Sequence, residues 1–255
     1  MTDRVVAIVQ ARTSSSRLPG KVLKDLIGVP MIVQQLDRLG RTRLVDRLVV
    51  ATSDDPSDDE LVGLLVARAQ DVVRGALDDV LGRFTEAMRT FPSEHVVRLT
   101  ADCPLADPDV VDAVVAYHLL GGSAITTNSV ESRMPDGLDV EVIRSSALLT
   151  AAEEATKLFE REHVTQFLYR RPDRFGVCHF PVLEDLGHLR WTVDEPADLD
   201  FVRAVYSKLY PANPQFGFRD VLRLLEREPE LARINSGIAR NEGLACSLER
   251  EQTRD

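Results

Sequence analysis

Cysteine is scarce in this chain: Cys103, Cys178 and Cys246 are the 3 cysteines among 255 residues, and they lie far apart. An odd number of distant cysteines suggests neither a disulfide framework nor a C-x-x-C metal site. Long apolar runs are also missing, since none approaches the roughly 18 residues that a membrane span needs. The first residues, MTDRVVAIVQ, lack the basic segment and long apolar stretch of a secretory signal. These absences predict a cytoplasmic protein that does not enter a membrane.

Positive charge is also in short supply, because 31 Lys and Arg stand against 41 Asp and Glu and the net charge is -10. Nucleic acids and anionic membranes attract clustered Lys and Arg, so neither is expected as a partner. With 44% hydrophobic residues the chain can bury one full core, and no Pro/Gly/Ser-rich linker divides it. We therefore expect a single domain over residues 1–235, in which residues 122–188 form a substrate-side lobe, and a polar, peripheral tail over residues 236–255.

Predicted strands and helices alternate along most of the chain. Residues 5–9 are apolar on both faces, which is typical of a central strand in a mostly parallel sheet covered by helices. Ser57 and Glu60 fit a capping box at one helix start, and Asp107-Pro108 starts another. The predicted strands are residues 5–9, 47–52, 71–74, 95–100, 124–128, 138–143, 176–180 and 189–193. The predicted helices are residues 31–39, 57–69, 78–88, 110–119, 147–159, 161–169, 196–210 and 218–228. This order indicates an α/β fold with a doubly wound sheet.

A loop of hydroxyls and cations follows the first strand. It contains three adjacent serines, Gly20 and the cations Arg12, Arg17 and Lys21. Open α/β sheets bind ligands at the carboxyl ends of their strands, and this combination of charges and backbone N–H groups suits a polyphosphate. The loop is not a Walker A motif, because Ser15 stands where its first glycine belongs and Val22 follows the lysine. The alternative is a surface loop whose charges are solvated.

Two carboxylates follow predicted strands elsewhere in the chain. Asp102 comes after residues 95–100, and Asp194 comes after residues 189–193, so both are expected at the same edge of the sheet. Magnesium takes a few carboxylate oxygens together with substrate phosphates, so the pair could hold one Mg²⁺ ion beside a nucleotide. The alternative for each aspartate is a helix N-cap.

The loop resembles the nucleotide-binding signature of the sugar-acid cytidylyltransferases, which include the synthetases of CMP-Kdo and CMP-sialic acid. The residues that carry the resemblance are Ala11-Arg12, Ser15 and Arg17-Leu18-Pro19-Gly20-Lys21. Within this family the loop is most similar to the SpsF-like branch. The resemblance implies a nucleotide-diphospho-sugar transferase (GT-A-like) fold, a three-layer α/β/α sandwich with a mostly parallel mixed sheet. It also implies that Arg12, Ser15 and Lys21 bind the triphosphate, with Arg12, Lys21 and Asp102 central to catalysis. By the same resemblance Asp102 and Asp194 bind the metal, whereas Arg17 either binds the nucleotide or faces a carboxylate.

Further motifs carry the resemblance to the base and acceptor sides. Arg74-Gly75 and Asp78-Asp79-Val80-Leu81 resemble an element beside the base, so Arg74 and Asp79 are candidates for nucleotide binding; alternatively, Arg74 pairs with Asp78 or Asp79. Residues 136–141 (DGLDVE) and 161–165 (REHVT) resemble elements that line the acceptor. Asn128, Asp136 and Glu141 would bind acceptor hydroxyls, and Arg161, Arg133 or Arg170 an acceptor carboxylate. His163 is either a hydrogen-bond donor or base there, or a packed core residue.

The resemblance implies a Mg²⁺-dependent enzyme that transfers CMP from CTP to an anionic hydroxyl acceptor, such as a ulosonic acid, with release of pyrophosphate. It also implies a homodimer completed through the lobe. A phosphonate acceptor or another nucleotide stays possible, because the loop recognises charge rather than a base. A glycosyltransferase or nucleotide-sugar binding protein is a further alternative. Such transferases usually carry a D-x-D metal motif at a strand end, whereas Asp107-Pro108-Asp109 and Asp198-Leu199-Asp200 fall at predicted helices.

Overall fold

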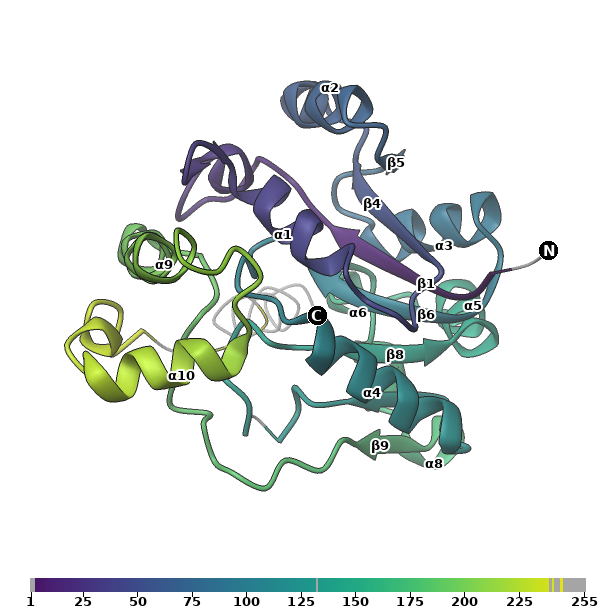
Figure 1. Ribbon diagram of the computed structural model, residues 1–255. Helices are drawn as coiled ribbons and strands as arrows, with labels where there is room; N and C mark the ends of the chain where they lie inside the picture. The colour runs from purple at the N-terminus through teal and green to yellow at the C-terminus, as the bar shows by residue number, and fades with distance from the viewer. Residues whose placement is uncertain (1–2, 132, 239, 241–243, 245–255) are drawn as a thin grey trace.

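The computed structural model of the protein describes residues 3–131, 133–238, 240 and 244. A seven-stranded sheet forms its centre, in the order β5-β4-β1-β6-β8-β7-β9 (Figure 1). Strands β5, β4, β1 and β6 are parallel, β8 is antiparallel to both neighbours, and β9 is parallel to β7. The strands are β1 (Asp3–Gln10), β4 (Arg47–Ser53), β5 (Asp71–Gly75), β6 (Ser93–Thr100), β7 (Ile125–Thr127), β8 (Glu141–Arg144) and β9 (Val177–His179); β2 (Asp25–Leu26) and β3 (Val29–Pro30) form a separate hairpin.

Helices cover both faces of this sheet, as the apolar pattern of β1 requires. Val5, Ala7 and Val9 face one core and Val6 and Ile8 face the other, because successive strand side chains point to opposite faces. The first core includes residues of α1 (Met31–Leu39), α2 (Asp59–Ala67), α4 (Pro108–Leu120), α9 (Pro196–Leu209) and α10 (Phe218–Arg227). The second includes residues of α3 (Val80–Thr90), α5 (Ser145–Glu154), α7 (Gln166–Tyr169) and α8 (Pro172–Phe175). Val164, between α6 (Leu158–Glu162) and α7, belongs to it as well. The three-layer α/β/α arrangement is confirmed.

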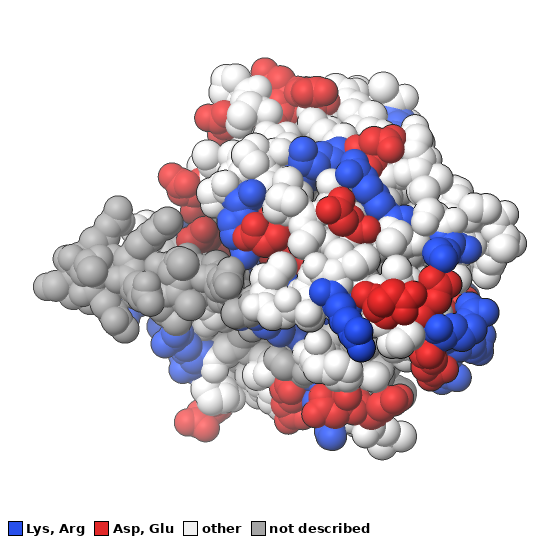
Figure 2. All heavy atoms as spheres, turned by 90° about the vertical axis from the view of Figure 1, so that its left-hand side faces the viewer, with Lys and Arg blue, Asp and Glu red and all other residues white. Residues whose placement is uncertain are grey.

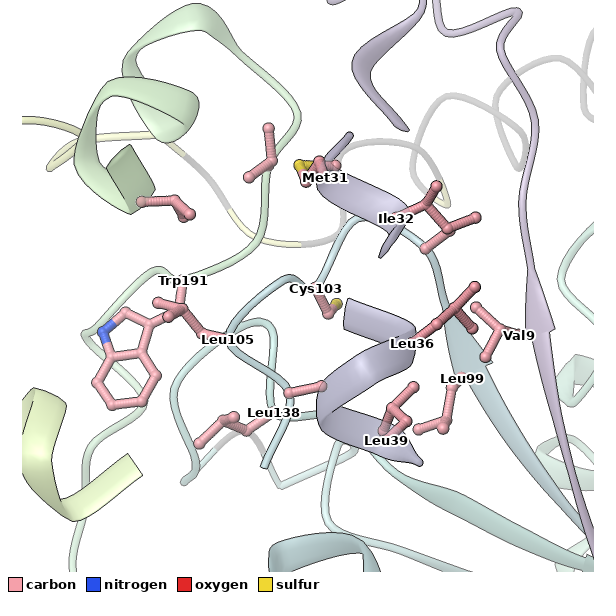
Figure 3. Close-up of a cluster of buried hydrophobic side chains, with 14 of the residues drawn as sticks. Val9, Met31, Ile32, Leu36, Leu39, Leu99, Cys103, Leu105, Leu138 and Trp191 are labelled. Carbon is pink, nitrogen blue, oxygen red and sulfur yellow. The ribbon is translucent and has the colours of Figure 1, made fainter. Parts of the chain in front are cut away.

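The first core reaches beyond the sheet toward the carboxyl ends of its strands. Figure 3 shows the apolar side of α1, with Ile32 and Leu36, packed beside Val9 and Leu99 of two neighbouring strands. Trp191, which is fully buried, lies in the same cluster and anchors the segment that leads to Asp194. Burial of a large aromatic side chain fixes the path of such an irregular segment. None of the helices in the described ranges combines the length and the apolar character needed to cross a membrane.

Three local predictions were wrong. Residues 189–193 do not form a strand of the sheet, because Trp191 N donates to Asp136 O and Val193 N to Asp102 O, and these two loops hold the segment outside the sheet. The predicted helix over residues 161–169 is interrupted between α6 and α7, where fully buried Val164 has φ 22°. The predicted helix over residues 147–159 ends at Glu154, and a separate short helix follows.

The capping box predicted from Ser57 and Glu60 does not form either. Asp55 caps a 3-10 turn, Pro56–Asp58, by accepting from Ser57 N at 2.9 Å. The fully buried Asp58 carboxylate accepts from Thr13 N at 2.7 Å and from Thr52 Oγ1 at 3.0 Å. A buried carboxylate needs several donors, and it finds them in the loop after β1. The start of α2 therefore holds that loop in place. The other 3-10 turns are Lys21–Leu23 and Leu231–Arg233.

Candidate active site

A cleft of about 760 Å³ lies at the carboxyl ends of β1 and β6. Figure 2 faces the side toward which β1 runs and shows Lys and Arg side chains interspersed with Asp and Glu. Polar and charged residues from several elements meet in the cleft, as expected for a ligand site in an open α/β sheet. The cleft lining includes the apolar Ala11 and the polar or charged residues Arg12, Ser15, Arg17, Lys21, Arg83, Arg98, Asp102, Asp136, Asp139, Glu141, His163, Tyr169 and Asp194.

Lys21 joins the two predicted metal ligands. Its Nζ donates to Asp102 Oδ2 at 3.0 Å and to Asp194 Oδ1 at 2.8 Å. Gly20, at φ 66°, provides the left-handed turn that starts the Lys21–Leu23 turn. Asp102 is not a helix N-cap, because Asp107 fills that role for α4, as predicted. The cationic loop and both carboxylates therefore converge at one place, as the sequence predicted.

Burial and charge act against each other in this cluster. Burial alone would raise the pKa of Asp102, but the charge of Lys21 and a hydrogen bond from Thr100 lower it to about 2. Burial alone would lower the pKa of Lys21, but the charges of Asp102 and Asp194 raise it. Both groups are therefore charged at neutral pH.

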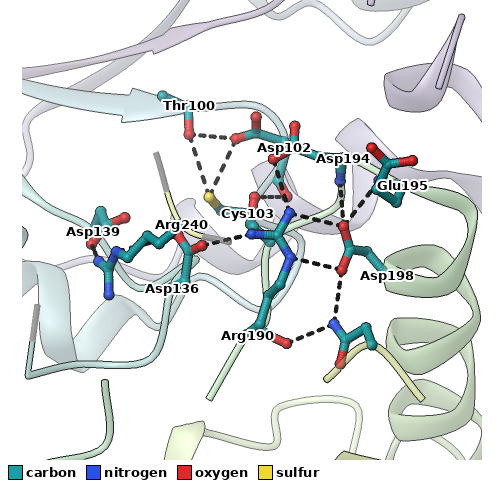
Figure 4. Close-up of polar contacts among 12 residues, drawn as sticks. Thr100, Asp102, Cys103, Asp136, Asp139, Arg190, Asp194, Glu195, Asp198 and Arg240 are labelled. Carbon is teal, nitrogen blue, oxygen red and sulfur yellow. Dashed lines mark hydrogen bonds and ion pairs between the residues drawn. The ribbon is translucent and has the colours of Figure 1, made fainter. Parts of the chain in front are cut away.

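Arg190 binds Asp194 (Figure 4), and no sequence motif singled out this arginine. Its guanidinium donates to Asp136 Oδ2 at 2.9 Å, to Asp194 Oδ2 at 3.1 Å and to Asp198 Oδ1 at 2.9 Å. Fully buried Asp198 accepts in turn from Asp194 N at 2.9 Å. Arg17 approaches from the other side, with Nη2 3.0 Å from Asp194 Oδ2. Arg17 thus faces a carboxylate, one of its two predicted roles.

The remaining loop residues also line the cleft. Ala11 is buried beside β4, and its N donates to Ala51 O at 3.0 Å. Ser15 Oγ accepts from Leu18 N at 3.4 Å, which closes the loop on itself. Arg12 is exposed, and its guanidinium makes no hydrogen bond or ion pair with the described residues. Arg12 is therefore available to an anion in the cleft.

Glu141, at the start of β8, anchors the opposite wall. This buried carboxylate is paired with Arg98 Nη1 and accepts from Thr165 Oγ1 at 2.9 Å and from Tyr169 Oη. The break between α6 and α7 brings Thr165 to this position. His163 also lines the cleft, and burial lowers its pKa. Arg98 was missed, although an arginine inside an otherwise apolar strand is a sequence signal for a buried partner.

Asp136 and Asp139 line the cleft together with a residue from the predicted tail. Arg240 Nη2 bonds Asp139 Oδ1, and its Nη1 donates to Met134 O at 3.1 Å. Burial raises the pKa of Asp139 to about 7, although the charge of Arg240 opposes the rise. Arg240 pairs with the cleft residue Asp139 and Leu244 lines the cleft, so at these two positions the tail is not peripheral. The rest of residues 239–255 lies outside the described residues.

Several predicted site residues do not reach the cleft. Arg74 Nη2 lies 2.7 Å from Asp59 Oδ1 rather than beside Asp78 or Asp79, and Nε donates to Ser53 O at 2.8 Å. Asp79 caps α3 by accepting from Gly82 N at 2.9 Å, and Arg161 Nη2 donates to it at 2.6 Å.

The predicted acceptor residues include further exceptions. Buried Asn128 donates to Leu138 O and accepts from Val140 N, both at 2.8 Å, so it braces the backbone. Arg170 lies over the Phe159 ring at 4.6 Å, and Arg133 is exposed outside the cleft lining. Of the acceptor candidates, Asp136, Glu141 and His163 line the cleft.

The chemistry of Asp102 and Asp194 fits a magnesium ion. Within the described part of the chain, no group of three or more His, Cys, Asp or Glu could hold a metal alone. Mg²⁺ is usually bound by one or two carboxylates and completes its shell with water and substrate phosphates. Two carboxylates beside a cationic loop meet that requirement.

Comparison with known proteins agrees with this arrangement. Residues 6–206 match the family described as cytidylyltransferase. An uncharacterized protein of Methanocaldococcus jannaschii is 30% identical over 92% of this chain and 96% of its own length. The spore coat polysaccharide biosynthesis protein SpsF of Bacillus subtilis is 29% identical over 89% and 96%. The 3-deoxy-manno-octulosonate cytidylyltransferase of Geobacter sulfurreducens is 33% identical over 51% of each chain.

A solved structure extends the likeness to three dimensions. A cytidylyltransferase from Leptospira borgpetersenii covers 93% of this chain and 100% of its own, with a TM-score of 0.87 and 25% identity. Motifs, geometry and comparisons together show that the chain belongs to the cytidylyltransferase family.

Proposed function

We propose that this protein transfers CMP from CTP to a hydroxyl group of a ulosonic acid and releases pyrophosphate. The observation that carries the proposal is that the Lys21 ammonium binds both Asp102 and Asp194. The same loop also carries Arg12, which is exposed and available to an anion. Cations beside paired carboxylates suit a metal-bound triphosphate. The acceptor is inferred from relatives named 3-deoxy-manno-octulosonate cytidylyltransferase.

In the proposed reaction, the acceptor oxygen attacks the α-phosphorus of CTP as the bond to the bridging oxygen of pyrophosphate breaks. The hydroxyl gives up its proton to the solvent, and pyrophosphate carries away the bonding electron pair. Arg12 and Lys21 would bind the departing phosphates and stabilise their charge. The cleft walls would align acceptor and nucleotide, which lowers the entropic part of the barrier.

A magnesium ion held by Asp102 and Asp194 would supply positive charge beside the α-phosphate oxygens. Lys21 now occupies the space between these carboxylates. We propose that its ammonium turns from them to the phosphates when nucleotide and Mg²⁺ bind. Lys21 would therefore pair with the aspartates in the free protein and with the leaving group in the complex.

The test measures pyrophosphate release from CTP, UTP, GTP and ATP with Mg²⁺ and a panel of ulosonic acids. We expect release with CTP and at least one acid, and none without the acceptor. Release only with a hydroxyphosphonate would overturn the acceptor assignment. Preference for another nucleotide would overturn the CTP assignment.

The positions of the two D-x-D sequences favour a cytidylyltransferase over a glycosyltransferase. Asp107 accepts from Asp109 N at 2.9 Å as the cap of α4, and Asp198 is fully buried against Arg190. Neither pair offers two carboxylates to a metal in the cleft.

We further propose a cytoplasmic homodimer as the active form. Light scattering at assay concentration tests the dimer, and a monomer with full turnover would contradict it.

A further inference from the structure

Arg83 is a buried cation on the wall of the cleft, in the first turn of α3. The residue is 2% exposed, and its side chain passes the end of β5. A Cβ at Gly75 would lie 3.1 Å from Arg83 Cγ, so the glycine leaves room for this side chain. Arg83 therefore lies beside the cleft, whereas Arg74 turns away toward Asp59.

The guanidinium of Arg83 has one edge bound and one edge unused. Nη1 donates to Ala76 O at 2.8 Å and to Leu77 O at 2.7 Å, which uses both of its N–H groups. Among the described residues, Nε and Nη2 have no hydrogen-bond partner, and Nε is buried. A buried donor without an acceptor is costly. The unused edge therefore calls for a ligand with neighbouring acceptors.

The surroundings place this edge away from the reacting phosphates. Burial lowers the pKa of Arg83, and the nearby charge of Arg12 lowers it further. Arg83 is held just after β5, which β4 separates from β1 in the sheet, whereas Asp102 and Asp194 bind Lys21 of the loop that follows β1. No described carboxylate forms an ion pair with Arg83. Arg12 and Lys21 are already placed to bind the phosphates. We therefore expect the free edge of Arg83, which backbone carbonyl oxygens hold in position, to bind a neutral group with two hydrogen-bond acceptors.

We propose that Arg83 recognises the cytosine base of CTP, with its Nε–H and Nη2–H groups donating to O2 and N3. The inference rests on the proposed function. Cytosine presents two adjacent acceptors at O2 and N3, and a guanidinium edge presents two parallel donors. Uracil carries N–H at position 3, which would face one of these donors. Arg83 would therefore select cytosine over uracil.

The test measures the affinities of CTP, UTP and 3-deaza-CTP by calorimetry in the presence of Mg²⁺. In 3-deaza-CTP a C–H group replaces N3, so one acceptor is lost. For the unmodified protein we expect CTP to bind about 10- to 100-fold more tightly than either analogue. Arg83→Lys keeps the positive charge but loses the two parallel N–H donors, so the variant should bind all three nucleotides with similar affinity. Arg89→Lys, on the exposed side of α3, should keep the original ratios.

The affinity ratio separates recognition from structural damage, because damage to the cleft would weaken all three nucleotides together. An unchanged ratio of CTP to UTP in Arg83→Lys would overturn the role of Arg83. If that variant does not fold, equal binding of CTP and 3-deaza-CTP by the unmodified protein would overturn it instead. Failure of the unmodified protein to bind any of the three would overturn the proposed function itself.

Discussion

Lys21 occupies an unusual position among the charged side chains, because one ammonium donates to two carboxylates that both face the cleft. A buried carboxylate without a partner would take up a proton and become a poor metal ligand. The ion pair instead keeps the pKa of Asp102 at about 2. The free protein therefore keeps Asp102 ionised and ready to bind a cation.

Substitution of Asp102 by Asn tests this role directly. The amide keeps the size of the side chain but removes a negative charge, and we expect turnover to fall by about 100-fold or more. Asp109→Asn is the matched control, since its carboxylate is 83% exposed in α4. Pyrophosphate release gives the rate, and circular dichroism checks the fold. Turnover within a few-fold of the unmodified protein would refute the metal role of Asp102.

The elements were predictable where local pattern decided them. The apolar spacing of residues 31–39 matches α1, and the Asp107-Pro108 start of α4 was predicted because both signals lie within a few residues. Trp191 and Asp58 show the limit, because each is positioned by loops distant in sequence. The choice of Arg83 over Arg74 as the cleft cation depends on how β5 ends, which periodicity does not reveal.

The connection between β7 and β8 offers a test of a position that was predicted to bind the acceptor. Asn128→Ala would leave Leu138 O and Val140 N without their side-chain partner in a buried region. We expect the free energy of unfolding to fall by about 2 to 3 kcal/mol. Urea denaturation measures this loss, and Asn213→Ala, at an exposed turn, is the control. Full stability with a raised acceptor KM would instead favour direct binding by Asn128.

Across the whole molecule, the parallel part of the sheet brings the loop after β1 and the aspartate after β6 to one edge. Arg190 and Trp191 bring the third component, Asp194, to that edge without an added strand. The family resemblance could identify the participants from sequence. The contacts that hold them come from segments as distant as Arg240, which no local pattern connects to the cleft.

Stability against pH depends on groups at opposite ends of this sheet. Burial lowers the pKa of His118, which contacts His95 and Thr126, to about 4. Between pH 6.5 and 4 the unfolded chain binds a proton at His118 that the folded protein does not, so acidification destabilises the fold. Asp139, with its pKa of about 7, is protonated in the folded state and ionised in the unfolded chain over this range. Acidification therefore stabilises the fold through Asp139.

Because these contributions oppose each other, the pH dependence of the unmodified protein alone does not isolate either group. His118→Gln removes the destabilising contribution of His118. The free energy of unfolding of this variant, relative to that of the unmodified protein, should therefore rise by about 1 to 2 kcal/mol when the pH falls from 7.5 to 5. Urea denaturation of both proteins at the two pH values gives this difference. His188→Gln, at an exposed histidine outside this cluster, is the control, and its stability relative to the unmodified protein should be the same at both pH values. The same stability difference at pH 7.5 and pH 5 would show that folding does not suppress protonation of His118.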